Sequence, residues 1–271
     1  MAKVETVRSL PAFAPYVPVA LPLRGLSMAH AAWVTFITDN PLTWWWCQGR
    51  RNPQADMEGP LYIYAAPNRQ LEDGKAVLAT VEELKEYAPF LMSLTILAPD
   101  GKPVPNARIE WWQATPAGVY AYSSYSLRGT FTTDAQGRIE ILTVTPGAYG
   151  PLQYLRAGHF HMIIDGGSQY ERLTTQLYVC PANDKQGMMK DFLNYMRAPR
   201  FGNLLQVWSI PTASGGKTDM NFPQLARDPE TEKRVEWWNA KMAERSTDKL
   251  EVIAGAETKI VLNKRPGWFG F

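Results

Sequence analysis

Short β-prone runs alternate with turn signals through the middle of the chain, from residue 90 to residue 179. Turn signals such as Pro99-Asp100-Gly101 and Asp134-Ala135-Gln136-Gly137 separate consecutive runs. Strands of roughly five to eight residues at this spacing are typical of an antiparallel β-sandwich. We therefore predict a mainly β fold with an antiparallel β-sandwich core, whose strands cover residues 90–98, 107–113, 130–133, 138–144, 159–164 and 173–179.

The segments on either side of this core have a different character. Residues 1–58 contain several prolines and the cluster Trp44-Trp45-Trp46-Cys47. They predict an irregular N-terminal arm that packs on the domain or contacts another subunit. No linker interrupts residues 59–271, which we treat as one domain with C-terminal helical elaborations. Helices are expected over residues 81–87, 185–196 and 229–245, and one or two further strands within 250–264.

Composition narrows the class of protein. The 271 residues carry a formal net charge of +2, and no dense run of Lys or Arg occurs, which argues against a nucleic-acid binder. No apolar run reaches transmembrane length, and prolines interrupt the apolar stretch near the N-terminus. Cys47 and Cys180 are the only cysteines, and we interpret them as free thiols, although a single bridge stays open. These features predict a cytoplasmic protein that contacts no membrane.

Two of the three histidines lie two residues apart, in the run His159-Phe160-His161. On a strand, residues i and i+2 point to the same face, so both imidazoles are close enough to bind one metal ion. A hydrogen-bonded pair of core histidines is the alternative. Tyr120 and Tyr149 each follow a turn at the end of a strand, where a tyrosine is ordinarily a half-buried structural residue. His30, in the arm, has no evident co-ligand nearby in the sequence.

Several short motifs occur in a fixed order between residues 99 and 179. They include Gly118-Val119-Tyr120, Thr145-Pro146-Gly147-Ala148-Tyr149 and Arg156-Ala157-Gly158-His159-Phe160-His161. The other pieces are residues 101–107 leading into 110–114, residues 133–137, and residues 173–178. Together they resemble the intradiol ring-cleavage dioxygenases, the non-haem Fe(III) family of catechol, protocatechuate and hydroxyquinol dioxygenases. The third motif is similar to the family's Arg-Pro-Ala-His-Ile-His.

The resemblance implies a site for Fe(III), because phenolate oxygens favour the ferric ion over the ferrous ion. Arg156 would lie beside the substrate ring and stabilise charge that develops on it. Gln176 would hold Arg156 or the substrate in place. Arg128 is a candidate to bind a substrate carboxylate. The implied metal ligands are Tyr120, Tyr149, His159 and His161.

The resemblance also implies the reaction. Both atoms of O2 would enter a catechol-type aromatic diol, and the ring would open between the two hydroxylated carbons to give a cis,cis-muconic acid derivative. Tyr149 would leave the metal and accept a substrate proton, whereas Tyr120 would remain bound. Protocatechuate, catechol and hydroxyquinol are the expected substrates. The family usually assembles, and the tryptophan-rich arm predicts a homo-oligomer, most simply a dimer.

Two departures from the family pattern and two further tyrosines bear on the site. Ala157 stands where the motif has proline, which is expected to loosen the loop without removing a ligand. Residues 1–58 show no recognisable counterpart of the helical N-terminal region of catechol 1,2-dioxygenases, which favours a protocatechuate-like member. Tyr122 and Tyr154 are additional tyrosines near the implied ligands, and Tyr154 competes with Tyr149 for that role.

Two other hypotheses explain the histidine pair. A cupin-like enzyme would bind ferrous iron or zinc through the His-x-His pair and a carboxylate, for which Asp165 is the candidate. A non-catalytic β-sandwich binding module would use the histidines only for packing. Neither would give the strong visible absorption expected of an Fe(III)–tyrosinate centre.

Overall fold

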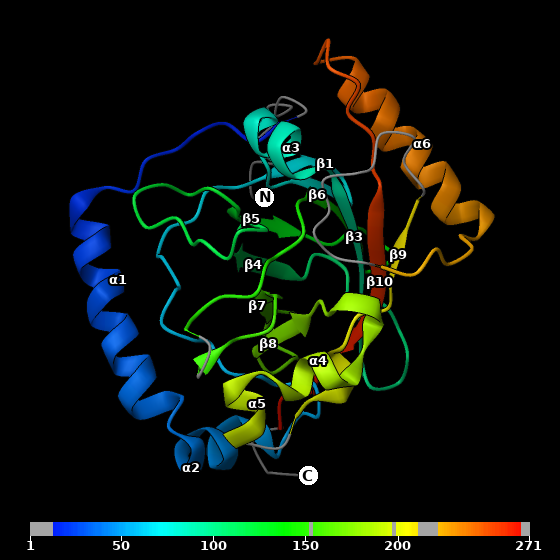
Figure 1. Ribbon diagram of the computed structural model, residues 1–271. Helices are drawn as coiled ribbons and strands as arrows, with labels where there is room; N and C mark the ends of the chain where they lie inside the picture. The colour runs from blue at the N-terminus through cyan, green and yellow to red at the C-terminus, as the bar shows by residue number, and fades with distance from the viewer. Residues whose placement is uncertain (1–12, 152–153, 197–198, 211–221, 267–271) are drawn as a thin grey trace, which may run out of the picture.

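The computed structural model describes residues 13–151, 154–196, 199–210 and 222–266. Ten strands within these residues form two sheets (Figure 1). The six-stranded sheet has the order β1-β2-β6-β3-β10-β9, and the four-stranded sheet has the order β5-β4-β7-β8. Most neighbouring strands are antiparallel, and β2–β6 and β3–β10 are the parallel pairs. The predicted mainly β sandwich is confirmed.

The elements follow the chain in a simple order. The strands are β1 (Gln70–Glu72), β2 (Lys75–Val77), β3 (Phe90–Leu97), β4 (Arg108–Gln113), β5 (Arg128–Thr132), β6 (Arg138–Thr143), β7 (His159–Asp165), β8 (Leu173–Tyr178), β9 (Val207–Ser209) and β10 (Ala254–Val261). The α-helices are α1 (Leu21–Trp33), α2 (Pro41–Trp44), α3 (Val81–Tyr87), α4 (Lys185–Met189), α5 (Phe192–Met196) and α6 (Pro229–Ala243).

Alternation along β7 decides which side chains enter the core. Phe160, Met162 and Ile164 are buried between the two sheets, where the ring of Phe160 lies 4.8 Å from that of Trp111. His159 and His161 therefore point to the opposite face of the four-stranded sheet. That face is also buried, because all of β7 except its last residue lies out of contact with solvent.

Predicted elements with strong local signals agree with the structure. The helix expected over residues 81–87 is α3, and a capping box between Thr80 and Glu83 stabilises its first turn. The long C-terminal helix is α6, which starts after the capping residue Asp228. Strands β1, β2 and β9 were not predicted, because three residues are too few to show a periodic pattern.

The N-terminal arm differs from the irregular chain that its prolines predicted. Helix α1 runs over Leu21–Trp33 and continues into a π-helical turn at Val34–Thr38. Pro22 and Pro41 lie in the first turns of α1 and α2, where a missing N–H leaves no internal hydrogen bond unmade. Pro22 and Pro41 therefore mark the starts of α1 and α2. The argument for a protocatechuate-like member, which rested on the lack of helix here, is wrong.

The arm is hydrogen-bonded to the segment that leads into the sandwich. His30 binds the Glu58 carboxylate through Nε2 at 2.5 Å, and its Nδ1 lies 2.9 Å from the Tyr64 hydroxyl. The Asp39 carboxylate accepts hydrogen bonds from the backbone N–H groups of Glu58 and Gly59. His30 thus has partners that only the tertiary structure brings to it.

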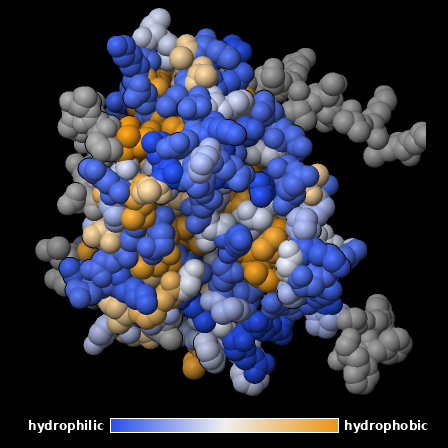
Figure 2. All heavy atoms as spheres, turned by 90° about the vertical axis from the view of Figure 1, so that its right-hand side faces the viewer, coloured by the Kyte–Doolittle hydropathy of each residue, from blue (hydrophilic) through white to orange (hydrophobic). Residues whose placement is uncertain are grey.

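The outward side of the arm is strongly apolar. Trp33, Phe36, Leu42 and Trp46 are exposed, Leu42 by 83% of its surface. The other side of the molecule, which carries α6, shows a mostly hydrophilic surface with scattered apolar groups (Figure 2). Among the described residues, no helix combines the length and the hydropathy needed to cross a bilayer.

Close contacts between backbones bring together the loops that surround β7. A Cβ atom on Gly147 would lie 1.9 Å from the carbonyl oxygen of Pro116, and one on Gly158 would lie 2.2 Å from that of Pro146. Side chains cannot occupy such positions, so glycine is required for the loops to stack. Their stacking sets the loop that carries Tyr149 beside the start of β7.

We expect Gly158→Ala to destabilise the protein by about 2–3 kcal/mol, because the added methyl meets a fixed carbonyl. Urea unfolding measures the change. Gly25→Ala is the control: this glycine lies inside α1 with open space around it, and alanine should stabilise the helix by roughly 0.5–1 kcal/mol. Equal stability of the Gly158→Ala variant and the native protein would contradict the proposed loop contact.

Burial raises the pKa of Asp39 to about 6, although two backbone hydrogen bonds oppose the shift. Folding therefore favours the protonated carboxyl, and the associated stability is complete below about pH 4 and is lost as the pH rises through 6. Between pH 4 and pH 7 the native protein should lose roughly 2–3 kcal/mol more unfolding free energy than Asp39→Asn. Urea titrations at several pH values test this, and identical pH profiles would refute it.

Candidate metal centre

The outer face of the four-stranded sheet carries a row of aromatic and polar side chains. Backbone pairing sets Trp112 of β4 and Gln176 of β8 on either side of His161. The same pairing sets Tyr178 beside His159. Because paired residues share a face, these five side chains lie together on the side of the sheet opposite the core.

The two imidazoles point at one position. Their Nε2 atoms are 2.8 Å apart, and both residues are buried. His159 donates from Nδ1 to the Ala157 carbonyl at 2.6 Å, which leaves its Nε2 with a lone pair. The indole of Trp112 stacks on the His161 ring at 4.9 Å, with 9° between the planes. Burial, and next the neighbouring His159, hold the pKa of His161 well below its usual range, so it stays neutral, as a metal ligand must.

The two tyrosines complete a group of four rings. The ring centroids of Tyr120 and Tyr149 are 5.2 Å apart. Tyr149 lies 5.6 Å from His159, and Tyr120 lies 6.2 Å from His161. The Tyr120 hydroxyl is buried and has no hydrogen-bond partner among the described residues. A buried hydroxyl without a partner is costly, which indicates that the site is built for a group that binds it.

This donor set fits a ferric ion. Burial raises the pKa of both phenols, for Tyr120 to well above its usual value, and for Tyr149 the neighbouring Arg156 opposes the rise. Without a cation the phenols therefore stay protonated, whereas a bound cation lowers the pKa of its ligands. Two imidazole nitrogens and two phenol oxygens suit a hard, highly charged ion.

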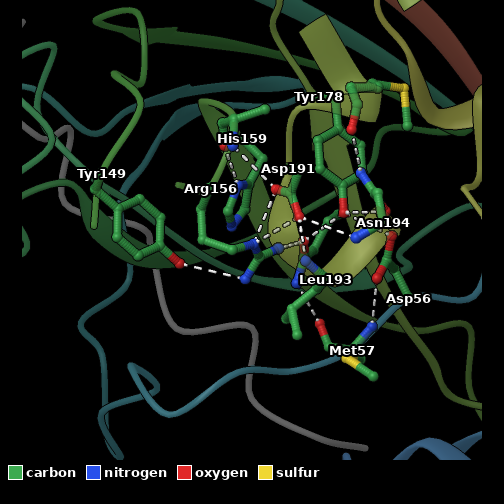
Figure 3. A network of polar contacts seen from close by, with 12 residues as sticks. Asp56, Met57, Tyr149, Arg156, His159, Tyr178, Asp191, Leu193 and Asn194 are labelled. Carbon is green, nitrogen blue, oxygen red and sulfur yellow. Dashed lines mark hydrogen bonds and ion pairs between the residues drawn. The ribbon is translucent and has the colours of Figure 1, made fainter. Parts of the chain in front are cut away.

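Arg156 lies beside the ring cluster in a buried polar network (Figure 3). Its Nε donates to both oxygens of Asp191, at 2.8 and 3.0 Å, and its Nη2 donates to Gln176 at 2.9 Å. Its Nη1 lies 3.5 Å from the Tyr149 hydroxyl. Burial opposes the charge, but Tyr149, Tyr178 and Asp191 raise the pKa of Arg156 above its usual value. Gln176 thus accepts a hydrogen bond from Arg156, and its role toward a substrate stays a prediction.

Arg128 lies under the loop that carries Tyr120. Its guanidinium donates to the carbonyl of Leu61 at 2.6 Å and to that of Ala121 at 3.1 and 3.2 Å. Burial lowers its pKa to about 10. These bonds fix the loop around Tyr120, whose ring centroid is 5.9 Å from the guanidinium carbon. Contact between Arg128 and a substrate carboxylate stays a prediction.

Other candidates from the sequence lie outside the ring cluster. Asp165, at the far end of β7, is exposed and caps the following turn through Gly167. In the described parts of the chain, no three or more His, Cys, Asp or Glu side chains are grouped to hold a metal. Asp165 is therefore not placed to be the carboxylate ligand that the cupin-like hypothesis requires. Tyr122 and Tyr154 are exposed by 57% and 55%, and Tyr154 packs on Phe192. Cys47 and Cys180 are free thiols, as predicted.

The sequence did not single out several residues of the network. Asp191 is completely buried, and the Tyr178 hydroxyl lies within hydrogen-bond distance of both Gln176 Oε1, at 2.9 Å, and Asp56 Oδ2, at 3.1 Å. The signal available for Asp191 was an acidic residue just before a short helix, which ordinarily indicates an exposed cap. The sequence could have predicted Tyr178, because it is two residues from Gln176 on one strand and therefore shares its face.

Comparisons with known proteins identify relatives of this chain. A protein-family model described as Dioxygenase matches residues 57–210, more than half of the chain. Catechol 1,2-dioxygenase of Acinetobacter baylyi is 28% identical over 148 residues, which cover 45% of this chain and 45% of that protein. The protocatechuate 3,4-dioxygenase beta chain of Burkholderia cepacia is 35% identical over 96 residues, 31% of this chain and 41% of that one.

The fold is also similar to a solved one. The crystal structure of catechol 1,2-dioxygenase from Pseudomonas arvilla C-1 superposes with a TM-score of 0.59 at 20% identity, covering 91% of this chain and 72% of that chain. The sequence matches span less than half the length of the two curated relatives. The matched family segment contains all four rings of the cluster. This chain therefore belongs to the intradiol ring-cleavage dioxygenase family.

Proposed function

We propose that this chain is an intradiol dioxygenase that holds one non-haem Fe(III) ion among Tyr120, Tyr149, His159 and His161. The observation that carries the proposal is the convergence of these rings, with two Nε2 atoms 2.8 Å apart and a buried phenol that lacks a partner. Family membership supports the same assignment. The domain of residues 59–271 would then be the catalytic domain.

The proposed reaction is ring cleavage of a catechol-type diol by O2. Both oxygen atoms enter the product, and the ring opens between the two hydroxylated carbons to a cis,cis-muconic acid derivative. When bound, Fe(III) would supply the Lewis acidity that binds the deprotonated diol and makes its ring reactive towards O2. The protein would supply the positions of the ligands, the proton acceptor and the fixed charge.

Each role follows from a position in the site. Tyr149 is half-buried and nearest to Arg156, so it is the phenol placed to accept a substrate proton. Arg156 stays protonated beside its ion-pair partner, the Asp191 carboxylate. Its Nη1 group faces the Tyr149 hydroxyl, where the positive charge stabilises negative charge on the substrate ring. Leu61, Trp112 and Ile163 pack around Tyr120 and exclude water from the ring cluster.

The substrate is a catechol, a protocatechuate or a hydroxyquinol. The curated relatives are named catechol dioxygenase and protocatechuate dioxygenase, so their names do not distinguish between catechol and protocatechuate as the substrate. A carboxylated ring needs a cationic partner, and Arg128 is the candidate although two loop carbonyls occupy much of its guanidinium. Comparing kcat/KM for catechol and protocatechuate in the native protein and Arg128→Gln tests this role. Losing the loop contacts lowers both values, so the role requires a larger loss for protocatechuate than for catechol.

We also propose that the arm mediates self-association into a homodimer. Its exposed side chains, among them Phe36, Leu42 and Trp46, form an apolar surface of the kind that specific interfaces bury.

We propose a cytoplasmic location, because a reducing compartment suits the two free thiols. Cell fractionation that recovers the protein outside the cytoplasm would contradict that location.

The purified protein should be red-brown, because electron transfer from phenolate to Fe(III) absorbs visible light. Adding catechol without O2 should move the band to longer wavelength as the diol binds the metal. A visible spectrum before and after this addition is the measurement. A protein that stays colourless after iron is supplied would overturn the proposed ligand set and favour a non-catalytic binding module.

Replacing the buried phenol should remove much of this signal. Tyr120→Phe should lose the band in large part and lower kcat by at least about 100-fold, since the metal loses an anionic ligand. Tyr122→Phe makes the same chemical change at an exposed position and should keep the spectrum and rate of the native protein. A Tyr120→Phe variant with the native band would show that Tyr120 is not a ligand.

Sedimentation equilibrium should find a dimer at micromolar concentration. The double variant Phe36→Glu/Leu42→Glu should be monomeric, because two charges would be buried in an apolar contact. Leu225→Glu, at an exposed leucine outside the arm, should leave the dimer intact. A native protein that is monomeric at high concentration would refute the association.

A further inference from the structure

Two segments that lie 35 residues apart are joined beside the ring cluster. The backbone N–H of Phe192 donates to the carbonyl of Leu155 at 2.8 Å. The Asp191 carboxylate accepts from the side chain of Arg156 and from the backbone N–H of Ala157, the latter at 2.9 Å. Asp191 and Phe192 therefore hold the segment that precedes β7 at three consecutive residues. Figure 3 shows the contact between Arg156 and Asp191.

Asp191 itself has little freedom. It is completely buried, and one carboxylate oxygen also accepts from the backbone N–H groups of Leu193 and Asn194, at 3.0 and 3.1 Å. These bonds fix the carboxylate in the first turn of α5. A carboxylate fixed in this way can fix the orientation of the groups that donate to it.

One of those groups is the Ala157 peptide. Ala157 stands where the family motif has proline, and the substitution predicted a looser loop. The structure differs: the N–H that alanine has and proline lacks donates to Asp191. The carbonyl of the same residue accepts from Nδ1 of His159 at 2.6 Å. Asp191 thus holds the residue whose carbonyl orients His159, and the tether replaces the stiffness that proline would supply.

The other group is the guanidinium of Arg156. Asp191 takes its Nε edge and Gln176 takes Nη2, so Nη1 is the part that faces Tyr149. An arginine held on two edges presents the third edge in one direction, at little entropic cost when a ligand binds.

We infer that Asp191 is a positioning residue, which aligns Arg156 with the substrate and His159 with the metal; this inference rests on the proposed function. Asp191 touches neither the substrate nor the ring cluster. It acts through a buried ion pair and a peptide hydrogen bond, and removing its charge leaves Arg156 buried without a counter-ion.

The test compares Asp191→Asn with the native holoenzyme, using catechol. We expect kcat to fall by roughly 10–100-fold, whereas KM changes by less than about threefold, because the substrate still binds the metal but its ring faces a misaligned arginine. In an Arg156→Gln background, adding Asp191→Asn should lower kcat by a smaller factor than it does alone, because only its effect on His159 through Ala157 is left. Losses that multiply, or an unchanged kcat in Asp191→Asn, would overturn the inference.

Asp228→Asn is the matched control. Asp228 also accepts from a backbone N–H at a helix start, that of Thr231, but it lies on α6 and has no contact with the network. Because Asn caps a helix about as well as Asp, this variant should change the melting temperature little and leave kcat unchanged. A loss of kcat as large in this control would mean that removing any capping carboxylate has the same effect, and would also overturn the inference.

A second variant covers the case in which Asp191→Asn does not fold. Asp191→Glu keeps the negative charge but displaces the carboxylate along the side chain, so it should fold and still lose kcat by at least about fivefold. Native kcat in Asp191→Glu would refute the positioning role.

A measurement without metal or substrate separates this inference from the proposed function. In the iron-free native protein, the Ala157 N–H should exchange with D2O at least about 100-fold more slowly than in Asp191→Glu. Fast exchange in the native protein would refute the tether. A native protein that shows slow exchange, binds iron and yet fails to cleave diols would refute the proposed function alone.

Discussion

Burial of β7 on both faces is the constraint on which the rest of the structure depends. Phe160, Met162 and Ile164 join the core between the sheets, so the alternation of a strand forces the two histidines to the other side. A solvated face would leave them ordinary surface imidazoles. Here Trp112 stacks on His161, and the loops with Tyr120 and Tyr149 cover the pair, so burial keeps His161 neutral and the two rings lie close together.

Covering this face requires buried charge to be balanced locally. Arg156 is neutralised by Asp191, and the remaining donors and acceptors of that pair are satisfied by Gln176 and by backbone N–H groups. Arg128 differs, because its partners are neutral carbonyls and burial lowers its pKa. Its charge lies near Tyr120, where an anionic phenolate would complement it. The electrostatics of the site thus suit negatively charged ligands on the metal.

The same face depends on parts of the chain that are distant in sequence. Gln176 donates to the carbonyl of Met57, and Asp39 of the arm accepts from Gly59, whose Cα hydrogen lies against the edge of His161. On the other side, the turn before α5 supplies Asp191. The arm and the C-terminal elaborations are therefore connected to the ring cluster by specific hydrogen bonds, so changes in either can alter the geometry of the site.

Local patterns in the sequence determined the strands of the sandwich, the capped helices and the shared face of His159 and His161, because alternation and turn residues act over a few neighbouring residues. The resemblance to a known family, and not a local pattern, supplied Tyr120 and Tyr149 as candidate ligands. The tertiary structure decided the contacts between distant residues, which local patterns do not specify. It gave His30 its partners, turned the proline-rich arm into helices, and buried Asp191 beneath Arg156. These outcomes depend on contacts between residues far apart in the chain, where burial and charge balance, and not local preference, determine the free energy.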